Sequence, residues 1–177
     1  MGDDIDMNFN IEHYESDNIE LEHDEIFKVE SILGFKLPKS YIDLMFKWNG
    51  GYLDVEYVSI LPKKIPNDLK YYLSDGVCTV SAISGLSSDI NNENGIIYTA
   101  QTAHEWGVNE NIIAFSGDGH TWLAFDYRNK QLAEPTIIYI ETDNGSFLKL
   151  ANDFDSYLRE LIPADNIYDE EGNIHLD

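Results

Sequence analysis

The chain has 177 residues, of which 43% are hydrophobic, and a formal net charge of −22 at pH 7. That length and composition predict one folded domain with its own core and exclude a disordered chain. Cys78 is the only cysteine, which excludes an intramolecular disulfide and a cysteine-based zinc site and favours a reducing compartment.

The negative charge is concentrated at the two ends of the chain. Residues 1–27 contain ten acids and no Lys or Arg, and residues 150–177 contain eight acids against Arg159 alone. Such a field repels nucleic acid and anionic membrane, because both are bound through cations. It attracts a basic protein partner and accelerates its association. The alternative is that the acidity only keeps the protein soluble.

Targeting signals are not apparent in the sequence. No stretch approaches the roughly 20 apolar residues that span a bilayer. The first ten residues, MGDDIDMNFN, have acids where a secretion signal has basic residues followed by an apolar run. We therefore expect a cytoplasmic protein that begins with an acidic lead over residues 1–23.

Two amphipathic helices are predicted next. The first follows Asp24, a candidate N-cap, and ends before Gly34, a candidate left-handed residue. The second has Pro38 in its first turn and is ended by Gly50 and Gly51. Apolar residues at helical spacing define both helices: Ile26, Val29 and Leu33 in the first, and Tyr41, Leu44, Met45 and Trp48 in the second.

The middle of the chain is rich in β-branched and aromatic residues and predicts a series of strands. We place them at 57–61, 77–86, 112–115, 121–127 and 136–140. Residues 99–106 could form a short helix, although 96–99 could instead form a strand.

The last part of the chain predicts a tight turn, a closing helix and a tail. Asn144-Gly145 marks the turn, and Pro163 ends the helix. Residues 163–177 are an acidic tail that we expect to lie loosely on the surface. The closing helix is predicted from the spacing of Leu148, Leu150, Phe154, Tyr157, Leu158 and Leu161.

This order of elements defines the expected fold class. Helices followed by strands and a final helix predict an α+β single domain over residues 24–162. We expect a largely antiparallel, twisted sheet packed with the N-terminal helix pair and the C-terminal helix.

The segment IIAFSGDGHTWLAFDYR, residues 112–128, raises the question of a catalytic or metal-binding loop. Asp118 and His120 could supply two metal ligands, but a catalytic metal usually takes three and the spacing places no third. A tight turn explains the same residues, because glycine reaches positive φ cheaply and Asp tolerates it. Residues 121–127 are apolar on both faces, which places this strand centrally in the sheet.

Motifs of the common enzyme classes are missing from the sequence. His104-Glu105-Trp106 is not a zinc-binding helix, because Val108 stands where the second His is needed. There is no nucleophile elbow, no phosphate-binding loop and no EF-hand. Cys78 lies within a predicted strand, where a buried thiol is typical. We expect no enzymatic activity, no metal and no cofactor.

Four pieces of the chain, in order, carry a resemblance to a known family. They are VESILGFKLPKSYIDLMFKWNGG, the mid-chain strands, the Gly-x-Gly hairpin of 112–128, and a last strand followed by LANDFDSYLREL. Together they resemble the SUKH superfamily, in its Smi/Knr-like branch, over roughly residues 26–161. The resemblance implies a non-catalytic α+β domain. For bacterial members it implies an immunity protein that binds and neutralises a polymorphic toxin, often a nuclease.

The expected partner is therefore a basic toxin, with a nuclease as the candidate class, and the protein itself is expected to be a monomer or weak homodimer. Hot spots at such interfaces favour aromatic and charged residues. For the acids the alternative is simple solvation, and for the tryptophan it is core packing. The candidate contact residues are Asp54, Glu56, Asp89, Glu93, Glu105, Trp106 and Asp118.

Three other functions stay open at this point. Eukaryotic relatives imply a regulatory or scaffold protein without a toxin partner. A metal-dependent enzyme would use Asp118 and His120. A nucleic-acid mimic would bind unrelated basic proteins through its charge alone.

Overall fold

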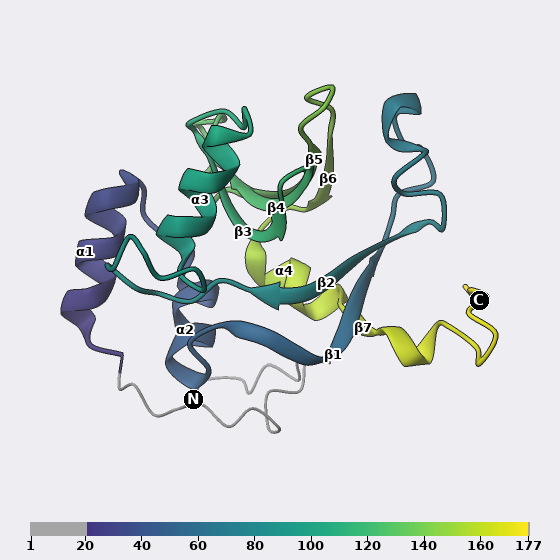
Figure 1. Cartoon of the computed structure of the whole chain (residues 1–177), viewed down its shortest axis with the longest axis horizontal. Coiled ribbons are helices and arrows are strands. Elements are labelled where there is room, and N and C mark those ends of the chain that lie inside the picture. The colour runs from purple at the N-terminus through teal and green to yellow at the C-terminus, as the bar shows by residue number, and fades with distance from the viewer. Residues whose placement is uncertain (1–20, 177) are drawn as a thin grey trace.

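A computed structural model describes residues 21–176, and these form an α+β domain of four α-helices and two antiparallel sheets (Figure 1). The predicted fold class is confirmed, although the sheet is divided into two. The expected acidic lead lies outside the described residues, apart from its last three positions.

The predicted N-terminal helix pair is confirmed as α1 (His23–Leu33) and α2 (Lys39–Lys47). Gly34 ends α1 with a φ of 77°, and its N–H donates to the Glu30 carbonyl at 2.8 Å. The prediction of Asp24 as N-cap is wrong, because Glu22 takes that position and no side chain caps the helix. Pro38 immediately precedes α2.

A buried carboxylate holds the corner between these helices. Glu30 is buried and accepts a hydrogen bond from the Leu37 N–H at 3.0 Å. Its other oxygen pairs with the Lys36 ammonium at 2.5 Å. A buried charge is tolerated when it is paired and hydrogen-bonded in this way, so the corner has a defined geometry.

The first sheet has the strand order β2-β1-β7. Its strands are β1 (Gly51–Ile60), β2 (Val77–Ile83) and β7 (Ile162–Pro163). β1 begins six residues before the predicted start, and Leu53 is the one buried residue among those six. The pairing with β2 shifts register between Tyr52 and Tyr57, which indicates a bulge.

The second sheet has the order β3-β4-β5-β6. Its strands are β3 (Ile112–Asp118), β4 (Thr121–Asp126), β5 (Thr136–Glu141) and β6 (Phe147–Ala151). β4 lies inside the sheet, as its two apolar faces predict. Leu123 and Phe125 belong to the main core, whereas Trp122 and Ala124 join a second cluster that includes Ala103 beyond the opposite face.

Two helix predictions are corrected by the structure. Residues 96–99 begin α3 (Ile96–Glu105) and form no strand. The closing helix is shorter than expected: it is α4 (Phe154–Glu160), capped by the Asp153 carboxylate, which accepts from the Ser156 N–H at 2.7 Å. Leu148 and Leu150 belong to β6 instead, because their spacing of two is the period of a strand that pairs with β5.

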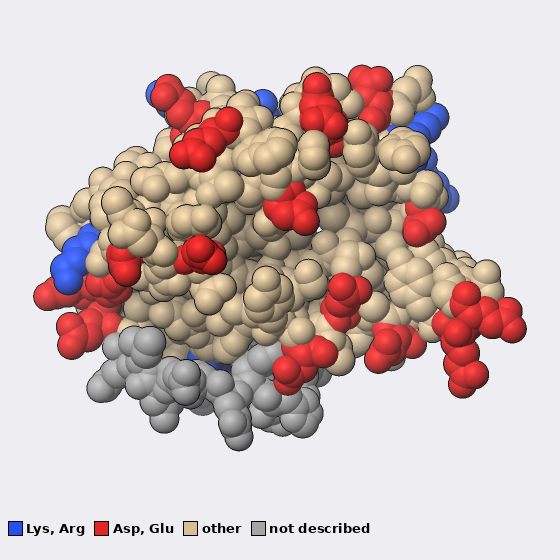
Figure 2. Space-filling model, viewed as in Figure 1, with Lys and Arg blue, Asp and Glu red and all other residues tan. Residues whose placement is uncertain are grey.

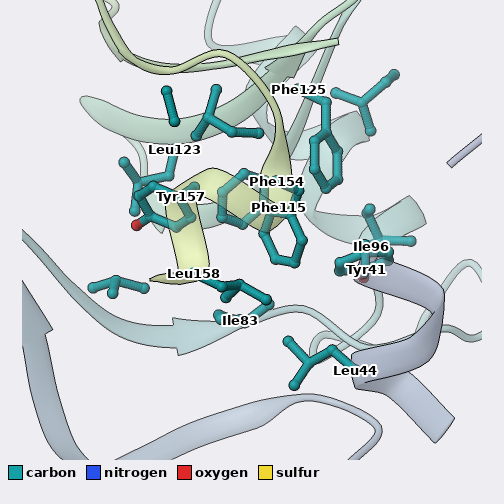
Figure 3. Close-up of a cluster of buried hydrophobic side chains, with 14 of the residues drawn as sticks. Tyr41, Leu44, Ile83, Ile96, Phe115, Leu123, Phe125, Phe154, Tyr157 and Leu158 are labelled. Atoms are coloured by element: carbon teal, nitrogen blue, oxygen red, sulfur yellow. The ribbon is translucent and has the colours of Figure 1, made fainter. Parts of the chain in front are cut away.

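An aromatic cluster at the centre of the core joins α2, α4 and the second sheet (Figure 3). Five ring pairs among Tyr41, Phe115, Phe125 and Phe154 have centroids 4.7 to 5.5 Å apart, mostly edge to face. Such pairs stabilise a core beyond their buried area. The Tyr41 hydroxyl donates to the carbonyl of Ser84, so the buried phenol is satisfied.

The start of the acidic tail packs more closely than expected. Ile162 and Pro163 form β7 along β1, and η2 (Ala164–Asn166) follows. Ile167 is then buried against Val58 and Val77. The tail is therefore anchored to the first sheet at Ile167.

Asn49, between α2 and β1, clamps the segment that follows β2. Its side-chain oxygen accepts from the Leu86 N–H at 2.7 Å, and its amide donates to the Leu86 carbonyl at 3.0 Å. Next to this clamp, Gly50 and Gly85 bring two backbones together: a Cβ on Gly85 would lie 2.1 Å from the Asn49 carbonyl oxygen. The end of α2 and the end of β2 are thereby joined.

Replacing Asn49 with Ala is expected to destabilise the fold by about 2 kcal/mol, because both backbone groups of buried Leu86 lose their partner. For a domain of this size, that corresponds to a fall in Tm of roughly 4–8 °C, measurable by calorimetry. Asn129→Ala is the control, since the side chain of exposed Asn129 accepts from the nearby Gln131 N–H, two residues along the chain. Equal Tm values for the two variants would contradict the role of the clamp.

Candidate functional site

The two sheets meet at one point and then diverge. At the meeting point the Ser84 N–H donates to the Phe115 carbonyl at 2.8 Å, and the Ser116 hydroxyl donates to the Ala82 carbonyl at 2.6 Å. These bonds join β2 to β3, which are edge strands of their sheets. Beyond this junction the two edges separate and leave a groove between them.

We call this feature the inter-sheet groove. Its larger part has a volume of about 300 Å³ and its smaller part, near the junction, about 120 Å³. Figure 2 shows the face on which the molecule is hollowed near its centre. The larger part is lined by Tyr52, Cys78, Thr79, Ser81, Ala82, Ser116, Gly117, Asp118, Thr121, Trp122, Leu123 and Tyr139.

Away from the junction, the segment around η1 (Asn67–Leu69) contacts the turn between β5 and β6. Asn144 and Ser146 donate long hydrogen bonds of 3.5 Å to the Asp68 carbonyl and carboxylate. Bonds of this length are weak, so this contact holds the two parts of the chain less firmly than the junction does.

Two of the seven predicted contact residues lie in the groove. Asp118 lines the larger part and Glu93 lines the smaller part. No Lys or Arg is among the described residues that line either part. The local charge of the groove is therefore negative.

The other predicted residues are exposed but lie outside the groove lining. Asp54 and Glu56 are in the exposed half of β1, and Asp89 is in the connection from β2 to α3. Glu105 and Trp106 end α3, and Trp106 is a surface residue with 47% of its area exposed. The structure thus does not gather the seven residues into one patch.

The predicted turn is displaced: Gly117 and Asp118 belong to β3, and Gly119 and His120 form the turn to β4. Gly117 has a φ of 129°, and a Cβ there would lie 2.2 Å from the Thr121 carbonyl oxygen. Gly119 packs beneath the Trp106 ring, which a Cβ would approach to 3.1 Å. Asp118 itself has no positive φ. Backbone geometry therefore explains both glycines.

His120 pairs with a residue that the sequence analysis missed. Its Nδ1 lies 3.1 Å from the Asp143 carboxylate, and its ring lies 5.0 Å from that of Trp106. The Asp143 N–H donates at 2.7 Å to Glu141, whose side chain is buried. The only signal for Asp143 was its place in the Thr-Asp-Asn-Gly turn. Within residues 21–176, no group of three His, Cys, Asp or Glu residues could hold a metal ion.

The floor of the groove contains the single cysteine, but its thiol is not activated. Cys78 is buried, and burial raises the pKa of its thiol to about 12. Burial also raises the pKa of the Tyr139 phenol. A nucleophilic cysteine needs a lowered pKa, so the Cys78 thiol lacks this feature of a nucleophile.

Sequence reasoning missed most of the groove. Ser81 and Ser116 are polar residues within apolar strands, which is the one signal that could have marked them. Tyr52 follows the glycine pair and is 80% exposed, which is unusual for a large aromatic residue.

Comparison with known protein families assigns the chain to one family. Residues 20–160 match the SMI1/KNR4 family (SUKH-1), and the chain belongs to that family, which includes immunity proteins. A search of curated proteins finds no match. Among the described helices, none is both long and apolar enough to cross a membrane.

We expect Cys78 to resist alkylation by iodoacetamide at pH 8 in the folded protein and to react after unfolding, because its raised pKa keeps it protonated. Ser81→Cys provides the comparison, since exposed Ser81 lies in the same groove and its thiol should react readily. Mass spectrometry follows both reactions. Rapid labelling of native Cys78 would mean that the groove holds an activated thiol.

Proposed function

We propose that this protein is an immunity protein that binds a cognate toxin, a basic nuclease, and neutralises it by steric and electrostatic occlusion. Support comes from a family that includes immunity proteins and from the acidic groove. A nuclease needs cations to hold its substrate, and an acidic protein is suited to cover them. The proposal places the protein in the cytoplasm as a non-catalytic inhibitor.

The distribution of charge supports a protein partner over nucleic acid or membrane. On the face shown in Figure 2, Lys and Arg lie near the rim, while Asp and Glu also occur around the central hollow. Tyr52 and Trp106 supply exposed aromatic surface on the described chain. Aromatic anchors surrounded by charges are common at protein interfaces.

The second candidate is a regulatory or scaffold module, which the same family resemblance also implies. A scaffold would be encoded without a neighbouring toxin gene and would have no effect on toxicity. The test is co-expression with the toxin candidate encoded beside the gene, followed by pull-down and size exclusion. A one-to-one complex that abolishes toxicity supports the immunity function, and no complex with toxicity intact favours the scaffold.

Reversing the charges of Glu93 and Asp118 to Lys is expected to slow association with the toxin about tenfold at low ionic strength, because the groove loses its attraction. Stopped-flow kinetics measures the rate. The control reverses Asp165 and Glu170, which are exposed in the tail, and changes the net charge equally. Equal slowing by both pairs would show that only the total charge matters.

A further inference from the structure

The outer edge of β2 is open along the groove. Within residues 21–176, β2 pairs with a strand on one side only. Its other edge bonds to β3 at the junction through the Ala82 carbonyl and the Ser84 N–H. On the other side of β2, the Leu61 N–H of the chain after β1 donates to the Gly76 carbonyl at 2.9 Å. Backbone groups alternate in side along a strand, so those of Cys78 and Val80 face β1 and that of Thr79, which lines the groove, faces the outer edge.

This edge lacks the features that usually prevent strand addition. Natural sheets protect their edges with charged residues, proline or very short strands. β7 is two residues long and contains Pro163, and the β6 edge carries exposed Lys149. β2, with the sequence VCTVSAI, has neither a charge nor a proline. β2 is therefore an unprotected outermost strand of the described sheets, and it lies beside the groove.

The groove also indicates what kind of segment it would accept. Glu93 and Asp118 are the only charged side chains among its described lining residues. Tyr52, exposed at the same site, offers a ring on which a cation or its aliphatic stem can pack. A second copy of this chain would bring a net charge of −22 of its own and would be repelled.

We propose that the inter-sheet groove receives an extended, Lys- or Arg-bearing segment of the partner, which adds to the free edge of β2 as a further strand. Main-chain hydrogen bonds to β2 supply affinity, and Glu93 and Asp118 select the basic side chains. The proposal rests on the proposed function for the identity of the partner, but the groove is testable without it.

The first test fills the groove. Ser81 is exposed on β2 and lines the larger part, so Ser81→Trp should obstruct the edge without replacing a core residue. Ser31→Trp on the exposed surface of α1 is the matched control. We expect Ser81→Trp to weaken the toxin complex at least about tenfold, mainly through faster dissociation, and Ser31→Trp to leave it unchanged. Circular dichroism verifies that both variants fold.

The second test uses wild-type protein and a synthetic peptide in which Lys alternates with Val. We expect binding that slows hydrogen exchange at the Thr79 amide, on the outer edge of β2, and leaves α1 unaffected. Two N-methylated versions of the peptide, each blocked on a different edge of its backbone, distinguish strand pairing from charge attraction. Methylation of the pairing edge should abolish binding, while methylation of the other edge should preserve it.

The outcomes separate this proposal from the proposed function. If wild-type protein forms the toxin complex and Ser81→Trp forms it equally well, the groove proposal is overturned and the immunity function stands. If no toxin complex forms, the immunity function fails, and edge-specific peptide binding still supports the groove. Equal binding of all peptide versions, or a homodimer abolished by Ser81→Trp, would also overturn the proposal.

Discussion

The close approach of two backbones at Gly50 and Gly85 is the constraint on which the arrangement of this domain depends. A Cβ on Gly50 would lie 2.3 Å from the Gly85 nitrogen, so neither position has room for a side chain. The contact places the end of β2 against the end of α2. Ser84, one residue before Gly85, can then bond to Phe115 of the second sheet and to Tyr41 of α2. One contact thus positions the helix pair, both sheets and the entrance of the groove.

The order of elements was predictable because each has a local cause in the sequence. Helical spacing identified α1 and α2, and β-branched runs identified most strands. The first half of β1 was missed although Leu53, Asp54, Val55 and Glu56 alternate as in a strand, because a short stretch with two acids also fits a loop. Leu148 and Leu150 were misassigned because apolar residues two apart precede a helix closely enough to look like part of it. In both places tertiary pairing decides the structure, and a local pattern does not contain it.

The candidate site was predictable only in part, because a groove depends on contacts between distant residues. Gly50 was identified as the end of a helix, but nothing near it in the sequence points to Gly85, 35 positions later. Asp118 and Glu93 were selected as acids near loops, and both line the groove. Asp89 and Asp54 satisfied the same criterion and did not. The groove exists because the two sheets separate, and the sequence of neither edge strand alone indicates that separation.

The anchored tail has a consequence for the approach of any charged molecule. A free chain end would average its charge over many positions, whereas Ile167 packs against Val58 and Val77 and keeps the tail beside the first sheet. The carboxylates of Asp165, Asp169 and Glu170 are therefore held at the end of the molecule opposite α1 (Figure 1). Charges fixed at one end contribute a lasting electric dipole moment. Such a moment turns an approaching charged molecule as well as drawing it in, so orientation begins before contact.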